Sequence, residues 1–120
     1  MAKYLYLTSR DEFFRIDLSK IVYFEADGNY THIYLSNKMK GTVCINLHNM
    51  QKTLSESLKE SASIFARVGK SHIINLTLVY NIAILRQKLT LSDGENFSYT
   101  VSISKDALKK LRELFIGKSE

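Results

Sequence analysis

The sequence predicts a mainly β fold with two modest helices, within a single domain covering residues 1–120. Most of the chain consists of short segments in which apolar and polar residues alternate, and such alternation is typical of half-buried strands. Polar turn residues separate these segments, and only two stretches repeat their apolar residues at helical spacing. A chain of 120 residues is long enough for one hydrophobic core and too short for two.

The first half of the chain begins with two predicted hairpins. The polar turn Ser9–Glu12 closes the first, and Asp27-Gly28-Asn29 closes the second, where glycine adopts left-handed dihedrals without a Cβ clash. Ser36–Lys38 then turns the chain into one more strand. The predicted strands of this half are Tyr4–Thr8, Phe13–Asp17, Ile21–Ala26, Tyr30–Leu35 and Met39–Ile45.

Both helices are predicted from apolar spacing and from their end signals. The first covers residues 47–60, with Asn46 as N-cap and with apolar residues on one face: Leu47, Met50, Leu54 and Leu58. The second runs from Lys105 to about Phe115, with Ser104 as N-cap and Gly117 as its stop.

Strands return between the helices. Phe65–Val68 leads to a polar corner, Gly69-Lys70-Ser71, and then to the apolar stretch Ile73–Leu85. A closing hairpin, Lys88–Leu91 and Phe97–Ile103, flanks a loop of turn residues at 92–96. Side chains on the apolar side of their elements should be buried, and these are Phe24, Ile33, Leu54, Val68, Ile74 and Leu111.

Composition limits the function classes. Seventeen basic against twelve acidic residues give a charge of +5, which suits nucleic acid but suits simple solubility equally well. No apolar run is long enough to span a membrane, and the first ten residues lack a signal-peptide core, so we expect a cytoplasmic protein that does not enter a membrane. The single Cys44 cannot form an internal disulfide.

An enzyme is not expected. The three histidines, His32, His48 and His72, are scattered, without the spacing of a metal site, and no cofactor site is predicted. Cys44 lies inside an apolar strand pattern, where a buried small residue is the expected role. Ser71 adjoins His72, but no nearby acid has an orienting role, so we predict no catalytic residues.

Binding has more support. Tyr30, His32 and Tyr34 share one strand face that either stacks on bases or packs a core; we expect packing for the tyrosines and contact with a partner for His32. Lys70 and Ser71 lie where the chain must reach the surface, which suits phosphate or base-edge contact, although a solvated corner would look the same.

The second predicted helix carries a basic stripe, Lys105, Lys109 and Arg112. Such a stripe is usually the solvated side of an amphipathic helix. Lys105 differs, because it opens the helix directly after a strand end, where a helix N-terminus favours anions. It therefore joins the candidate binding residues.

Three blocks of the sequence carry a family resemblance. Ile21–Ala26 followed by Gly28-Asn29-Tyr30 resembles the block I-x-Y-I-E-A-x-G-N-Y, and Phe65–Val68 with Ser71–Asn75 resembles F-x-R-V-H-R-S-Y-I-V-N. Leu91–Gly94 and Val101-Ser102 resemble a closing hairpin that ends in V-S. Together they resemble the LytTR family of bacterial DNA-binding domains, the output module of many response regulators.

The resemblance implies an elongated stack of small antiparallel sheets whose loop residues enter successive major grooves of duplex DNA, commonly at paired direct-repeat sites. The family's contact positions correspond here to Thr31 or His32, then Lys70 beside Ser71, then Ile103. It also implies a role in transcription regulation within a two-component system, with a homodimer on DNA and a separate sensor or receiver protein as possible partners. A helix-turn-helix is not expected, because no two helices are joined by a short turn.

Two residues depart from the family pattern. Gly69 replaces the usual histidine of the corner, and Ile103 replaces the usual basic residue after V-S. Ile103 continues the alternating apolar set, so we expect it to face the core, with Lys105 replacing the lost guanidinium only as a point charge. These departures leave two hypotheses open: sequence-specific DNA binding, and a protein-interaction module of the same fold with weak or lost DNA binding.

Overall fold

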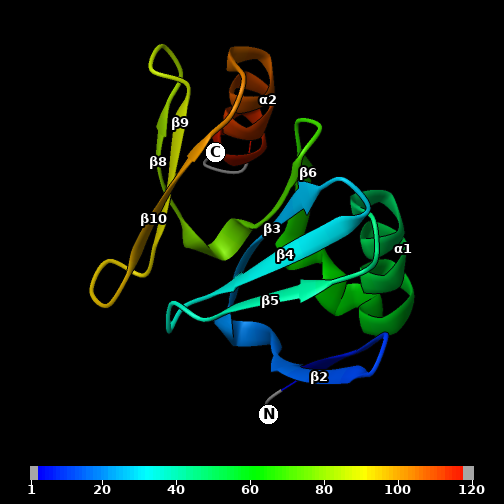
Figure 1. The fold of residues 1–120 in the computed structure, drawn as a ribbon. Helices are drawn as coiled ribbons and strands as arrows, with labels where there is room; N and C mark the ends of the chain where they lie inside the picture. The colour runs from blue at the N-terminus through cyan, green and yellow to red at the C-terminus, as the bar shows by residue number, and fades with distance from the viewer. Residues whose placement is uncertain (1–2, 118–120) are drawn as a thin grey trace.

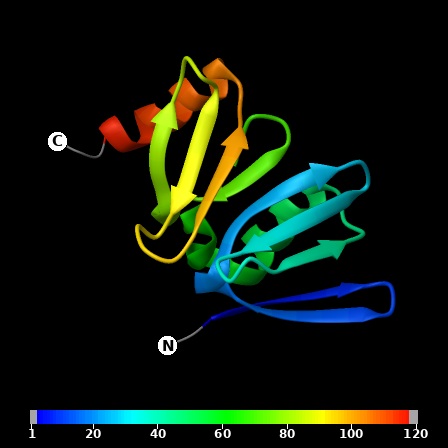
Figure 2. The same ribbon diagram turned by 60° about the vertical axis from the view of Figure 1, so that its left-hand side comes forward.

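The computed structural model describes residues 3–117 and confirms a mainly β fold, with about 45% of the residues in strands. These residues form three separate antiparallel sheets, two α-helices and three short 3-10 helices. The sheets lie one after another along the molecule, which measures 42 × 34 × 27 Å (Figures 1 and 2). The expected stack of small sheets is therefore present.

The first sheet is the predicted N-terminal hairpin, and the second is formed by five strands in the middle of the molecule. β1 (Tyr4–Ser9) pairs with β2 (Glu12–Asp17). The central sheet has the order β5-β4-β3-β7-β6. Its strands are β3 (Ile21–Asp27), β4 (Tyr30–Leu35), β5 (Lys40–Val43), β6 (Phe65–Val68) and β7 (His72–Asn75).

The third sheet has the order β10-β9-β8. Its strands are β8 (Val79–Ala83), β9 (Lys88–Ser92) and β10 (Ser98–Ser102). A 3-10 turn at Leu76–Leu78 divides the apolar stretch and carries the chain from the central sheet to the third. Asn75 holds this crossing, because its buried side chain donates to the Ile21 carbonyl at 2.9 Å and accepts from the Thr77 N–H.

Two hydrophobic cores lie on opposite faces of the central sheet, so the expectation of a single core is wrong. Strand alternation points Phe24 and Ile33 to one face, where α1 (Leu47–Leu58) and the first hairpin cover them. It points Tyr23 and Ile74 to the other face, which the third sheet and α2 (Lys105–Ile116) cover. All six predicted core residues are buried: Phe24, Ile33, Leu54, Val68, Ile74 and Leu111.

The helix ends follow the sequence signals. Asn46 accepts a hydrogen bond from the Asn49 N–H at 2.8 Å and starts α1, and Ser104 accepts one from the Ala107 N–H at 3.3 Å and starts α2. A 3-10 segment, Lys59–Ile64, follows α1. The prediction for Cys44 is wrong: β5 ends at Val43, and Cys44 lies exposed just beyond it.

Candidate nucleic-acid interface

One long side of the molecule collects turns from separate parts of the chain. The β3–β4, β6–β7 and β8–β9 turns lie along it, together with the junction between β10 and α2 (Figures 1 and 2). The strand pairings place them there, since Asp27 pairs with Tyr30 and Val68 pairs with His72 at the ends of their ladders. We call this side the turn edge.

The turn edge is rich in exposed cations. Lys70 lies in the β6–β7 turn, Arg86 in the β8–β9 turn, and Lys105 at the start of α2, and all three are exposed. The β9–β10 loop lies on the opposite side of the molecule and carries Asp93 and Glu95 (Figure 1). Asp27 in the β3–β4 turn and Asp106 beside Lys105 offset part of this charge, but the three cations still favour an anionic partner at the turn edge.

The β6–β7 turn is held rigidly while its side chains stay free. Gly69 has φ of +68°, in the left-handed region that favours glycine, and this lets the chain reverse within residues 69–71. Arg67 donates from Nη2 to the Lys70 carbonyl at 2.7 Å, and the Ser71 carbonyl accepts from the Ala26 N–H at 2.8 Å. The backbone is therefore fixed from both sides, and the Lys70 and Ser71 side chains are exposed to solvent.

Thr31 is not available to a partner, and this candidate is corrected. Its side chain is fully buried, and its hydroxyl donates to the Ile45 carbonyl at 2.6 Å. The hydroxyl thereby ties β4 to the segment that leads into α1. Strand alternation explains the burial, because Thr31 shares a face with Ile33, toward the first core.

His32 lies on the other face of β4, between its paired neighbours Glu25 of β3 and Thr42 of β5. Its ring is held between two partners, with Nδ1 2.8 Å from Thr42 Oγ1 and Nε2 2.9 Å from Asp27 Oδ2. The side chain is 15% exposed, so one ring edge reaches solvent beside the β3–β4 turn. A partner that reaches His32 there meets a ring whose orientation is already fixed by Thr42 and Asp27.

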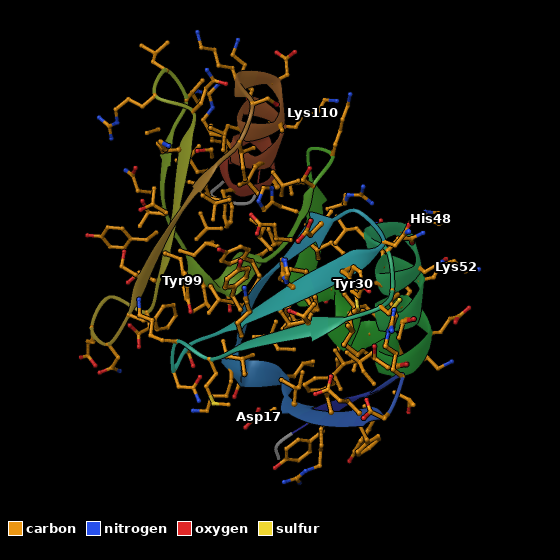
Figure 3. The ribbon with its side chains drawn as sticks, in the orientation of Figure 1. Asp17, Tyr30, His48, Lys52, Tyr99 and Lys110 are labelled. Atoms are coloured by element: carbon orange, nitrogen blue, oxygen red, sulfur yellow. The ribbon has the colours of Figure 1, made fainter. Side chains whose placement is uncertain are left out.

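The neighbouring aromatic residues divide between packing and exposure. Tyr34 stacks on Tyr23 with ring centroids 4.4 Å apart and donates to Glu25 Oε1 at 3.1 Å, and burial raises the pKa of Tyr34 to about 12. The expected packing of Tyr34 is confirmed. Tyr30 instead is 38% exposed and accepts a hydrogen bond from Arg10 Nη2, so packing was the wrong expectation for it (Figure 3).

His72 follows the corner but points inward. Burial lowers the pKa of His72, and the opposing effect of Glu25, whose Oε2 lies 3.4 Å from Nε2, is smaller. Within residues 3–117, the same nitrogen forms no hydrogen bond. His72 is therefore a core residue and is not a partner for Ser71.

Ile103, at the third family contact position, is also unavailable to a partner. Ile103 is 6% exposed and packs in the second core, which confirms that it faces inward. Lys105 is exposed at the first position of α2, directly after Ser104 caps the helix. Lys105 therefore offers a charge on the turn edge, but not at the place where a side chain on residue 103 would project.

A groove of about 730 Å³ separates the β6–β7 turn from α2. Lys70, Ser71 and Lys110 contribute polar groups to it, and Leu114 contributes an apolar wall. Lys110 was missed by the sequence analysis; Figure 3 shows it on the side of α2 toward the β6–β7 turn. Its signal was available, because Lys110 lies three residues after Ala107, which packs against the second core, and so it falls nearer to the inward side of α2 than the basic stripe does.

No three His, Cys, Asp or Glu side chains within residues 3–117 are grouped so as to hold a metal ion. Asp93 closes the β9–β10 loop by accepting from the backbone N–H groups of Glu95 and Asn96, and these hydrogen bonds lower the pKa of Asp93 to about 2. Across the same residues, no helix is both long and apolar enough to cross a membrane.

Known proteins match the chain over nearly its whole length. The family model of the LytTr DNA-binding domain matches residues 11–116. Two curated relatives, the heme-containing CO-sensing transcriptional regulators RcoM 2 and RcoM 1 of Paraburkholderia xenovorans (strain LB400), are each 30% identical over 105 residues. The match covers 82% of this chain and 34% of each relative, so the chain spans about a third of their length.

A solved structure shares the fold. The LytTr DNA-binding domain of a putative methyl-accepting/DNA response regulator from Bacillus cereus superposes with a TM-score of 0.61, at 21% identity, over 93% of this chain and 95% of that one. At this identity the similarity concerns the fold alone. The family match over residues 11–116 shows that the chain belongs to the LytTR family of DNA-binding domains.

Proposed function

We propose that this domain binds duplex DNA sequence-specifically through turn-edge side chains in the major groove, and thereby regulates transcription in a bacterial signalling system. The β6–β7 turn is the observation that carries the proposal. It presents Lys70 and Ser71 to solvent on a backbone that Arg67 and the β3 strand hold in place. A rigid support lowers the entropy lost when a side chain is fixed against a base edge.

The contacting residues have distinct roles in this proposal. Lys70 is the main contact and donates to a base edge or phosphate, and Ser71 adds a hydroxyl beside it. Lys105 neutralises a phosphate as a point charge. His32 contacts the DNA backbone with the exposed edge of its ring. Thr31 is omitted because it is buried.

The biological setting follows from the same proposal. The family resemblance implies paired direct-repeat sites, so we propose that two copies lie on one duplex as a homodimer, under the control of a separate sensor or receiver protein. The two curated relatives are described as heme-containing CO sensors, and this chain matches only about a third of each. A DNA-binding role places the domain in the cytoplasm.

A second function is favoured by one observation. Ile103 occupies a family contact position and is buried, which removes one bidentate base contact worth roughly 1–3 kcal/mol of discrimination. A domain that had lost specific recognition in this way could instead serve as a protein-interaction module with the same fold.

A salt-titrated mobility shift separates the two functions. The wild-type chain is first used to select duplexes from a random-sequence library, and its affinity for a selected duplex is then compared with that for mixed-sequence calf thymus DNA. DNA binding must weaken steeply as salt rises, because each neutralised phosphate releases counterions. The proposal expects a selected duplex that binds more tightly than mixed DNA at every salt concentration. If the selection enriches no duplex and the affinity for all DNA stays negligible at low salt, the protein-interaction function replaces DNA binding as the proposed function.

Variants then assign the contacts. Lys105→Ala should weaken binding to all sequences alike and reduce the salt slope by about one unit, as expected for one lost phosphate contact. Arg112→Ala serves as the comparison on the same helix, since Arg112 lies nearly two turns from the strand end and already approaches Glu113 at 3.8 Å. Equal effects of both changes would remove Lys105 from the interface.

A further inference from the structure

We propose that the tip of the β8–β9 hairpin, formed by Leu85, Arg86 and Gln87, is a further DNA-contacting element, with Arg86 as its reading side chain. This inference rests on the proposed function and adds a contact that the family positions do not include. Ile103 leaves the end of β10 without the basic side chain that is usual there, and Arg86 would supply one close by.

The hairpin tip lies directly against that place. The Ile103 N–H donates to the Gln87 carbonyl at 3.1 Å, so the backbone of the tip and the end of β10 are in contact. The Ile103 side chain turns into the second core. The shallow hollow at this point is lined by Arg86, Gln87, Lys88, Ser102, Ile103 and Ser104, a set that contains no acidic residue.

The side chains at the tip are suited to a base edge. Arg86 is exposed and forms no hydrogen bond or ion pair with any of residues 3–117, so its guanidinium is free to donate two parallel bonds to guanine. Gln87 is exposed beside it, and its amide matches the adenine edge. Leu85 is 84% exposed, which places an apolar group where a thymine methyl could cover it.

The backbone presents these groups on a firm support. The Gln87 N–H donates to the Ile84 carbonyl at 3.1 Å, which closes a tight turn with Leu85 and Arg86 at its outermost point. Lys88, the first residue of β9, donates to Ser102 Oγ at 2.7 Å and so ties the hairpin to β10. The tip is the end of a three-stranded sheet, because β9 pairs with β10 as well as with β8, so the turn residues themselves would make the contact with a groove.

The tip and the Lys70 corner can reach one duplex together. Both lie on the turn edge (Figures 1 and 2), and the longest dimension of the molecule is 42 Å. The tip lies at one end of this edge and the β6–β7 turn lies between it and the β3–β4 turn, so one duplex laid along the edge can meet both.

The test uses three variants of the intact chain on the selected duplex and on calf thymus DNA. Arg86→Ala removes the guanidinium, and Arg86→Lys keeps its charge without its fork. Lys20→Ala is the charge-matched control, since Lys20 is exposed and immediately precedes β3, at the other end of that strand from the β3–β4 turn. Thermal melts should be alike, because none of these side chains is buried.

Arg86→Ala should bind the selected duplex about tenfold more weakly than wild type, as expected for one lost bidentate pair. Its salt slope should fall by about 0.9. Arg86→Lys should restore the salt slope but not the preference for the selected duplex, and hydroxyl-radical footprints should lose protection at one end of the site only. Lys20→Ala should match wild type.

Two results would overturn the inference. One is an Arg86→Ala variant whose affinity, salt slope and footprint match those of Lys20→Ala. The other is an Arg86→Lys variant that keeps the full preference for the selected duplex over calf thymus DNA. That result would mean that Arg86 contributes only its charge and makes no base-specific contact. In both of these results the wild-type chain still binds DNA. Failure of the proposed function would instead appear as no DNA binding by the wild type.

Discussion

Leu54→Ala tests whether α1 packs on the central sheet. Leu54 is 2% exposed and lies on the buried stripe of α1, in the same core as Phe24 and Ile73. Burying a leucine side chain contributes about 1.5–3 kcal/mol, and the cavity left by its removal adds to the loss. Both effects together predict a decrease of roughly 2–5 kcal/mol in the free energy of unfolding.

Urea unfolding followed by far-ultraviolet circular dichroism measures this loss. A domain of this size has roughly 5–15 kcal/mol of stability, so the variant should still be mostly folded in water, with a lower transition midpoint and an unchanged slope. Leu85→Ala is the matched control, because the same atoms are removed from a side chain that is 84% exposed. That change should cost no more than about 0.5 kcal/mol. A Leu54→Ala loss below about 1 kcal/mol would refute the packing of α1 on the sheet, since core truncations of leucine cost more.

Three further predictions concern the turn edge and its support. Thr31→Val should lower the free energy of unfolding by about 1–2 kcal/mol in urea unfolding, because the hydroxyl bond to Ile45 is lost, while DNA affinity stays unchanged; a selective loss of affinity would contradict its burial. Gly69→Ala should cost about 1–2 kcal/mol in thermal melts because φ is +68° there; an equal or higher stability would contradict that backbone. Burial lowers the pKa of His72 below its usual 6.5, so the unfolded chain takes up the proton first and stability should fall as pH drops through that value. Urea midpoints of His72→Gln measured across this pH range should lack that decrease, and a parallel decrease would refute it.

Local patterns predicted the elements well because each depends on its own residues. Leu47, Met50, Leu54 and Leu58 repeat at helical spacing, and they form the buried stripe of α1 behind the cap at Asn46. Ile103 continues the strand alternation, and it is buried as expected. The same alternation also placed Thr31 on an inward face, and it outweighed the family position that implied a DNA contact.

The arrangement of the interface could not be predicted in the same way. Lys70, Arg86 and Lys110 come together only because strand pairing and helix packing bring distant segments to one edge, and no local period encodes that. Two cores were missed because the order of the five central strands, which buries the sheet on both faces, depends on long-range pairing. Cys44 was misplaced because β5 ends one residue before it.

The salt dependence of DNA binding by Lys70→Ala, measured against wild type and Lys20→Ala on the selected duplex, tests the central claim most directly. Lys70 is exposed on a turn whose carbonyl is fixed by Arg67, so the change should leave the fold intact. We expect Lys70→Ala to lose its preference for the selected duplex and about 0.9 of the salt slope, with Lys20→Ala at wild-type values. A Lys70→Ala variant that binds as wild type does across the whole salt range would contradict the claim that the β6–β7 turn reads DNA.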